Sequence, residues 1–243
     1  ATILLDYLHQ KSLYPAAIAA TKEDLALSQA VVRQSLHLAM QFARRDFPQN
    51  TASIKPTLTP LFDPIIAGGG ALSDASRPGQ GLLLLLDSVQ PVGITTVILD
   101  QNNLLPLLGV AASQNNILPV QVLESGAFLS VGTVISPVVS TRQGAPILRA
   151  KLTYENGAEA RVDLKFGSLE TLPLSIGESA ELTIQTVHGA DVGFGPGKGG
   201  SISVSGGALG VVFDGRGRPL DLPSDPVRRR ELIKKWNWTL GGG

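Results

Sequence analysis

The 243-residue sequence contains no cysteine. The chain therefore forms no disulfide and offers no thiolate nucleophile, and zinc or iron–sulfur sites with cysteine ligands are excluded. It contains only three histidines, His9, His37 and His188, which lie too far apart in sequence to form a metal-binding pair. We therefore expect each histidine to be structural or exposed. The absence of cysteine is compatible with the cytoplasm, which is the location that we expect.

An excess of charge of either sign is also lacking, because 20 Lys and Arg residues balance 20 Asp and Glu residues. No basic stripe is available to neutralise phosphates, so we expect no nucleic-acid partner. The one basic cluster, residues 228–230 with Lys234 and Lys235, is expected to form the solvated face of a helix. The longest run of leucines, residues 82–86, is too short to cross a bilayer and predicts a buried helix, so we expect no membrane partner.

Apolar residues make up 43% of the chain and charged residues 16%, which is typical of a globular protein with a sizeable core. The sequence begins at Ala1 rather than at methionine. We therefore expect a processed or truncated chain.

Helical patterns dominate the chain before about residue 118. Thr21 and Asp24 form a capping-box pattern ahead of a helix that is expected to end near Arg45 and Pro48. Three further segments predict a strand at 64–67, a buried helix at 79–89 and an apolar, β-branched run at 92–99. A helix at 104–112 follows, with Pro106 in its first turn. This alternation is typical of an α/β layer.

Short strands separated by glycine turns are predicted after residue 118, and they favour a sandwich or a barrel. Asn156-Gly157 indicates a type I′ hairpin. Asp225-Pro226 marks the start of a C-terminal helix. We therefore expect two units, residues 1–118 and residues 119–243. The predicted strands are 120–123, 133–139, 147–154, 158–166, 181–187, 201–205 and 210–213.

A glycine turn in the segment PIIAGGGAL, residues 64–72, is the most informative feature of the sequence. A short apolar strand leads into Gly68, Gly69 and Gly70, and a helix is expected to follow. Glycine permits a tight turn and leaves room for a flat ligand against the backbone, beyond the carboxyl end of a strand. A purely structural strand-to-helix turn explains the three glycines equally well, so both interpretations stay open.

Other candidate motifs are weaker. The segment GFGPGKGG at 193–200 departs from the phosphate-loop pattern, since Val192 replaces its first glycine and Gly199 its Ser or Thr. We expect an ordered β-loop there, although Asp191 and Lys198 offer a possible surface recognition pair. No Gly-x-Ser-x-Gly nucleophile motif occurs. Four single carboxylates are expected to be ordinary turn or surface acids, with Asp100 the best placed for a ligand: Asp87, Asp100, Asp163 and Glu170.

The segment 65–72 resembles the adenosine-contacting loop of the actin-like ATPase and sugar-kinase superfamily. Five further stretches carry a more specific combination of residues, at 85–95, 104–109, 132–137, 191–197 and 228–232. With the glycine turn, they resemble the accessory protein encoded beside coenzyme-B12-dependent glutamate (methylaspartate) mutase, a family related to the hydantoinase/oxoprolinase group. The likeness extends over nearly the whole chain from about residue 20.

The resemblance implies an α+β fold, in which a partial actin-like ATPase α/β lobe precedes a β-rich barrel or sandwich with a C-terminal helix. It implies that ATP or ADP, with magnesium in the intact protein, places its purine against Gly68, Gly69 and Gly70, flanked by Ala71 and Leu72. The phosphate loops of the family, each an Asp followed closely by Gly, have no counterpart in residues 1–62. They would belong to an upstream part of the ATPase domain, so we expect no catalytic residue in this chain and no hydrolysis by it alone.

The expected function is therefore that of a C-terminal fragment of an ATPase-like accessory or reactivating protein, with a B12-dependent mutase as its partner. A non-enzymatic interaction module with a structural glycine turn is the alternative. The wider relationship also leaves a hydantoinase-like hydrolase as a third and weaker hypothesis.

Overall fold

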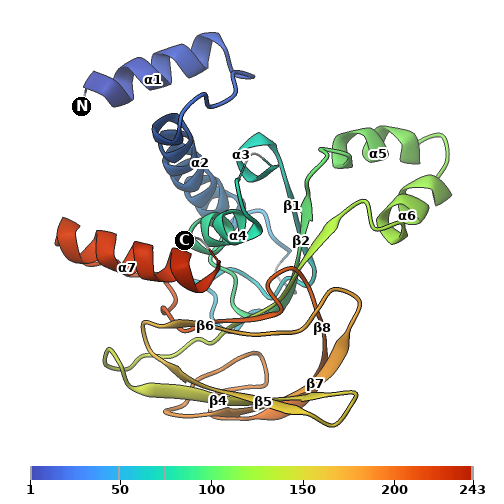
Figure 1. Ribbon diagram of the computed structural model, residues 1–243, viewed down its shortest axis with the longest axis vertical. Helices are drawn as coiled ribbons and strands as arrows, with labels where there is room; N and C mark the ends of the chain where they lie inside the picture. Colours follow the sequence, from blue (N-terminus) through green and yellow to red (C-terminus); the bar gives the residue numbers. More distant parts are fainter. Residues whose placement is uncertain (1, 49, 74, 242–243) are drawn as a thin grey trace.

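The computed structural model describes residues 2–48, 50–73 and 75–241 and arranges them in three layers (Figure 1). Helices cover one face of a first, five-stranded sheet, and a second, four-stranded sheet covers part of its other face. The first sheet has the order β1-β2-β3-β9-β6, in which β1 is parallel to β2 and β3 is parallel to β9. Its strands are β1 (Ile65–Gly68), β2 (Gly93–Asp100), β3 (Leu129–Ser136), β9 (Val211–Asp214) and β6 (Leu169–Leu172).

The second sheet is antiparallel throughout, with the order β5-β4-β7-β8. Its residues alternate between the core and solvent, as expected for a sheet with one solvated face. On β4, for example, Leu148, Ala150 and Leu152 are buried, whereas Arg149 lies on the solvated face. The strands are β4 (Pro146–Tyr154), β5 (Glu159–Lys165), β7 (Ser179–Thr186) and β8 (Gly200–Ser205).

Two helices begin where the sequence signals place them. Thr21 caps α2 in a capping box with Asp24, and Asp225 caps α7 ahead of Pro226. Both of these predicted helix starts are confirmed. The helices are α1 (Thr2–Leu13), α2 (Lys22–Ala43), α3 (Gly70–Ser73), α4 (Pro78–Ser88), α5 (Leu105–Ala112), α6 (Ile117–Glu124) and α7 (Pro226–Thr239).

The helical side of the first sheet is built around α4. All five leucines at 82–86 are at most 2% exposed, because the sheet lies on one side of the helix and α2 on another. A helix that is apolar all round is stable only when it is covered all round. Trp236 of α7 and Val97 of β2 belong to the same apolar cluster. The predicted buried helix is therefore confirmed.

The two sheets meet in a second apolar cluster. Ile135, Val211 and Phe213 of the first sheet belong to the same cluster as Leu152 and Leu182 of the second, and all five are fully buried. Within the described ranges the strands form two open sheets and no closed barrel, so the sandwich-like alternative is the one observed.

Several local expectations are wrong. Residues 120–123 lie in the helix α6 rather than in a strand, because packing against α5 outweighs the strand propensity of Val120 and Val122. The hairpin at Asn156-Gly157 is not type I′, since only Gly157 has a positive φ, of 82°. The N–H of Tyr154 donates to the carbonyl of Ala158, which closes a three-residue loop with its left-handed residue at glycine. The sequence patterns also missed α1 and β6.

The first sheet takes strands from both sides of residue 118: β1 and β2 precede it, and β3, β6 and β9 follow it. No helix among the described residues combines the length and the apolar character needed to cross a membrane.

Candidate functional site

The glycine turn lies at the carboxyl ends of the parallel strands β1 and β2. The register pairs Gly68 with Asp100, the last residues of the two strands. A Cβ at Gly68 would stand 3.2 Å from the Cβ of Asp100, so the close approach of the strands favours glycine there. Gly69 has a φ of +109°, a conformation that strains any residue with a side chain. The turn therefore needs glycine for structural reasons alone.

Polar side chains at the end of β2 and in the loop after it organise this region. The N–H of Gly69 donates to the Oδ1 of Asn103 over 3.1 Å. The two carboxylate oxygens of Asp100, a residue only 2% exposed, accept from the N–H groups of Leu104 and Leu105 at 2.9 and 2.8 Å. Asp100 thus caps the start of α5, and a structural role explains its position without a ligand.

A groove of about 490 Å³ opens beside the turn, between α1, the segment that follows it, and α2. Its volume falls within the range of small-molecule sites, and its walls are mainly apolar. Three side chains with polar groups, Tyr7, Lys11 and Ser28, also reach it. The Lys11 ammonium group donates to the carbonyls of Pro15 and Ala17, which fixes the segment after α1. The groove is lined by Tyr7, Lys11, residues 15–19, Leu25, Ser28, Val31, Val32, Gly70 and Ala71.

The five residues predicted to contact a purine are thus divided. Gly70 and Ala71 line the groove. Gly68 and Gly69 form the turn behind it and face Asp100 and Asn103. Leu72 packs against the core cluster around α4. The sequence patterns did not predict α1, which supplies one wall of the groove, because its apolar residues show no clear amphipathic pattern.

The loop 193–200 is an ordered connection between β7 and β8, as expected. Asp191 is 7% exposed, and its Oδ1 accepts from the N–H groups of Gly193 and Gly195 at 2.7 and 3.0 Å. Asp191 therefore shapes the loop and does not form an exposed recognition pair with Lys198. In the part of the chain that the structure describes, no three His, Asp or Glu side chains gather as metal ligands would.

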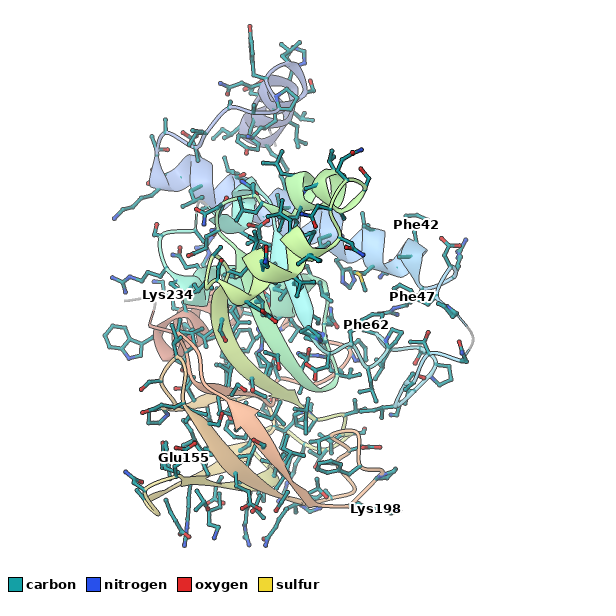
Figure 2. The ribbon with its side chains drawn as sticks, turned by 90° about the vertical axis from the view of Figure 1, so that its right-hand side faces the viewer. Phe42, Phe47, Phe62, Glu155, Lys198 and Lys234 are labelled. Carbon is teal, nitrogen blue, oxygen red and sulfur yellow. The ribbon has the colours of Figure 1, made fainter. Side chains whose placement is uncertain are left out.

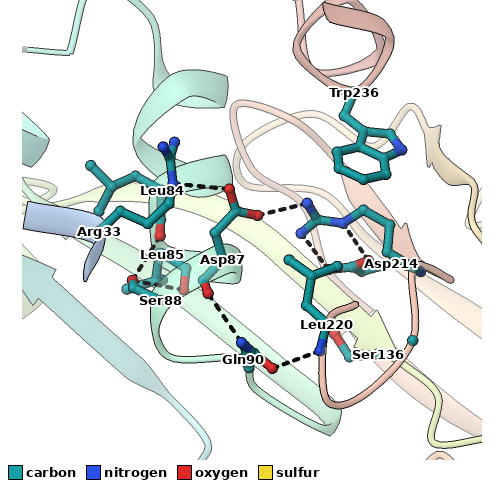
Figure 3. A network of polar contacts seen from close by, with 12 residues as sticks. Arg33, Leu84, Leu85, Asp87, Ser88, Gln90, Ser136, Asp214, Leu220 and Trp236 are labelled. Carbon is teal, nitrogen blue, oxygen red and sulfur yellow. Dashed lines mark hydrogen bonds and ion pairs between the residues drawn. The ribbon is translucent and has the colours of Figure 1, made fainter. Parts of the chain in front are cut away.

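A buried ion network is the strongest electrostatic feature of the molecule (Figure 3). Asp214 and Arg216 have fully buried side chains, and two hydrogen bonds of 2.8 and 2.9 Å join them. Arg218 adds a contact of 2.7 Å to the second oxygen of Asp214. Asp87 of α4 pairs with Arg216 at 2.7 Å and with Arg33 of α2 at 3.0 Å. The network therefore ties two helices to the loop after β9.

Burial alone would raise the pKa of Asp214. The two adjacent guanidinium groups of Arg216 and Arg218 outweigh that effect and hold the pKa of the carboxyl well below its usual range. Burial alone would lower the pKa of Arg216. The carboxylates of Asp214 and Asp87 outweigh that effect and raise the pKa above its usual value. The Arg216 guanidinium also lies 4.8 Å from the ring centroid of Trp236, which brings α7 into the same cluster.

The expectation that Asp87 is an ordinary turn or surface acid is wrong, because its side chain is 11% exposed and joins two arginines. The pattern Asp214-x-Arg216-x-Arg218, directly after a buried strand, was the available signal for this network. Asp163 is a surface acid as predicted, with its side chain 75% exposed.

Comparison with protein-family models, with curated proteins and with solved structures finds no match to this chain.

Proposed function

We propose that this chain is the nucleotide-base-binding portion of an ATPase-like accessory protein, and that the groove beside Gly70 and Ala71 receives the purine. One observation carries the proposal: the glycine turn at the carboxyl edge of a parallel strand pair opens onto an apolar groove of nucleoside size. A coenzyme-B12-dependent mutase is the proposed partner of the whole assembly, supported by the resemblance of the sequence segments alone.

The groove is suited to a base better than to a phosphate. Its walls are mainly apolar, and its cation, Lys11, already donates to two backbone carbonyls. Phosphoryl transfer depends on charge neutralisation and positioning by metal ions and phosphate loops. We therefore propose that the chain binds the purine and that groups outside it handle the phosphates and magnesium.

Calorimetric titration with adenosine, with ADP and with ATP plus magnesium tests this proposal. We expect saturable binding with a dissociation constant on the order of 0.1–1 mM, equal for adenosine and ATP within about threefold, because the base makes the contacts. No saturation by any of the three compounds, or ATP binding that depends strongly on its phosphates, would overturn it.

Two substitutions test whether the base binds in the groove. Ala71→Arg and Ser28→Trp each place a large side chain in the groove and should each weaken adenosine binding at least tenfold, or about 1.4 kcal/mol. Ala26→Arg is the matched control, since Ala26 is an exposed alanine of the same helix as Ser28 and lies outside the groove. Thermal unfolding of each variant shows whether it is folded. Equal binding by folded Ala71→Arg and Ser28→Trp would contradict the site.

A protein-interaction role, the alternative function, is favoured by a different feature, the edge of the second sheet at β8. The nucleotide titration does not depend on that edge, so the two roles are tested separately.

A further inference from the structure

The strand β8 forms one edge of the second sheet and, among the described residues, pairs only with β7 (Figure 1). Figure 2 views the molecule from the side on which this strand lies. Proteins usually keep an edge strand from pairing with other chains by placing charged residues or proline on it. The sequence of β8, GSISVS, contains neither. The opposite edge strand, β5, carries a charge at every second position: Glu159, Arg161, Asp163 and Lys165.

Alternate residues of β8 direct their backbone groups away from β7. The N–H of Gly206, directly after β8, donates to the carbonyl of Glu178, directly before β7. Backbone groups two residues apart in a strand point to the same side, so the even-numbered residues of β8 face β7. Ser201, Ser203 and Ser205 therefore face the free edge. In the part of the chain that the structure describes, the N–H and C=O groups of Ser201 and Ser203 meet no other strand.

A groove of about 390 Å³ runs beside this free edge, between β8, the face of β2 turned away from α4, and the loop that precedes β8. Phe194 of that loop lies against Gly200 at the start of β8, and the hydroxyl of Thr133 donates to the carbonyl of Ser205 at its end over 3.2 Å. These contacts mark the two ends of the free edge, which is about 17 Å long. Four partly exposed apolar side chains line the groove: Leu61, Ile94, Phe194 and Ile202.

The groove has a negative charge at one end. Asp63 is the one charged residue among the described residues that line it. Its Oδ1 accepts from the N–H of Thr96 over 2.8 Å. Thr96 is the register partner of Thr133, which contacts Ser205, so Asp63 lies toward the end of β8 rather than its start. A ligand with a positive charge at this end complements the groove.

We propose that β8 binds an extended peptide segment of another protein, which adds to the second sheet as a fifth, antiparallel strand. Such a strand lies about 4.8 Å from β8, where its backbone can pair with the free groups of Ser201 and Ser203. Its side chains opposite Ile202 and Val204 enter the groove, and those between them face solvent. The matching segment has two apolar residues two positions apart and a Lys or Arg at its N-terminal end, close to Asp63.

The backbone and charge of the site select this occupant over others. A helix satisfies its own backbone groups, so it leaves those of Ser201 and Ser203 unpaired. A second copy of the chain that paired through its own β8 would bring no cation to Asp63, because β8 has no charged residue. A basic extended peptide meets both requirements.

Fluorescence anisotropy with a labelled synthetic peptide, KTVTVTT with both ends capped, tests the proposal. We expect saturable binding with a dissociation constant on the order of 100 µM. Methylation of the backbone nitrogen of the fourth residue, which lies opposite Ser203, should weaken binding at least tenfold. Methylation at the fifth residue is the matched control, since that N–H points away from β8, and it should change binding less than about threefold. No saturation by KTVTVTT, or equal binding of both methylated peptides, would overturn the proposal.

Ser203→Pro removes the backbone donor at the centre of the free edge and should weaken peptide binding at least tenfold. Proline is tolerated on an edge strand where the lost N–H faces outward, and thermal unfolding shows whether the variant is folded. Ser203→Ala is the matched control, because it keeps the N–H and should bind like the wild type. Thr96→Arg, which places a large side chain in the groove without changing β8, should also weaken binding at least tenfold.

Asp63→Asn tests the charge. Asparagine keeps an oxygen that can accept from Thr96, so the variant should weaken binding of KTVTVTT about threefold and leave binding of the neutral peptide QTVTVTT unchanged. The proposal is overturned if folded Ser203→Pro and Thr96→Arg both bind KTVTVTT like the wild type. It is equally overturned if the wild type self-associates through β8, Ser203→Pro is monomeric and neither binds the peptide.

Discussion

Asp214→Asn is expected to lower the free energy of unfolding by about 3–5 kcal/mol, the loss typical of a buried ion pair from which one partner is removed. The carboxylate is fully buried and accepts from Arg216 and Arg218 through both oxygens. Asparagine has nearly the same size but carries no charge, and its amide group presents donors to guanidinium groups that are also donors. Two buried arginines would then lose their main counter-ion.

Urea unfolding of the wild type and the variant, followed by circular dichroism, measures this loss. Asp163→Asn is the matched control. Asp163 is 75% exposed and lies 3.5 Å from Arg149, itself 67% exposed, so its removal should change the free energy of unfolding by less than about 0.5 kcal/mol. Equal effects of the two substitutions would show that the buried network does not hold α4 and the loop after β9 together.

The same carboxyl predicts a dependence on pH. Arg216 and Arg218 depress the pKa of folded Asp214, so the stabilisation is complete above the unfolded pKa of about 3.9 and is lost as the pH falls below it. Between about pH 5 and pH 2.5 the wild type should therefore lose stability more steeply than Asp214→Asn, by up to about 1.4 kcal/mol per pH unit. Parallel curves for the two proteins would mean that Asp214 has an ordinary pKa.

Gly132→Ala is expected to cost about 4 kcal/mol or more, or to leave no folded protein. Gly132 lies in β3 with a φ of +131°, and a Cβ there would stand 1.9 Å from the carbonyl oxygen of Gly210. That atom belongs to the backbone, so no side-chain rotation relieves the clash. The Cβ would force apart β3 and the segment that leads into β9.

Gly126→Ala separates this clash from backbone strain. Gly126 also has a positive φ, of +76°, but a Cβ there would meet no atom within 4 Å. We expect it to cost about 1 kcal/mol, the strain alone. Thermal unfolding of the three proteins provides the comparison, and a Gly132→Ala protein as stable as Gly126→Ala would contradict the predicted clash.

The elements that the sequence predicted correctly carry their signals locally. Five consecutive leucines can be stable only in a fully covered helix, and Thr21 with Asp24 completes a cap within four residues. The wrong strand prediction at residues 120–123 depended on a partner outside the segment. Residues 120–123 have strand-forming side chains, but the surface they meet belongs to α5, and sequence periodicity contains no information about that contact.

The candidate site shows the same division. The glycine turn and its position after a strand followed from three adjacent glycines, and the structure places it at the edge of the parallel pair. The pairing of Asp87 with Arg216 joins residues that are 129 positions apart in sequence. The groove wall from α1 belongs to a helix that no sequence motif marks. One sequence cannot bring such groups together, because the pairing is decided by packing.

The connection from β3 to its parallel neighbour β9 contains the whole second sheet and β6. Parallel neighbours are commonly linked by a single helix, whereas the connection between β3 and β9 is about seventy residues long and must be accommodated before the two strands can pair. The hairpins of the second sheet form between near neighbours in sequence, so they can assemble early. The pairing of β3 with β9, in the middle of the first sheet, can form only after the last part of the chain is available. During synthesis, β3 therefore leaves the ribosome with an open edge. That edge is paired only when residues 211–214 of β9 have been synthesised, and the same segment supplies the buried carboxylate of Asp214.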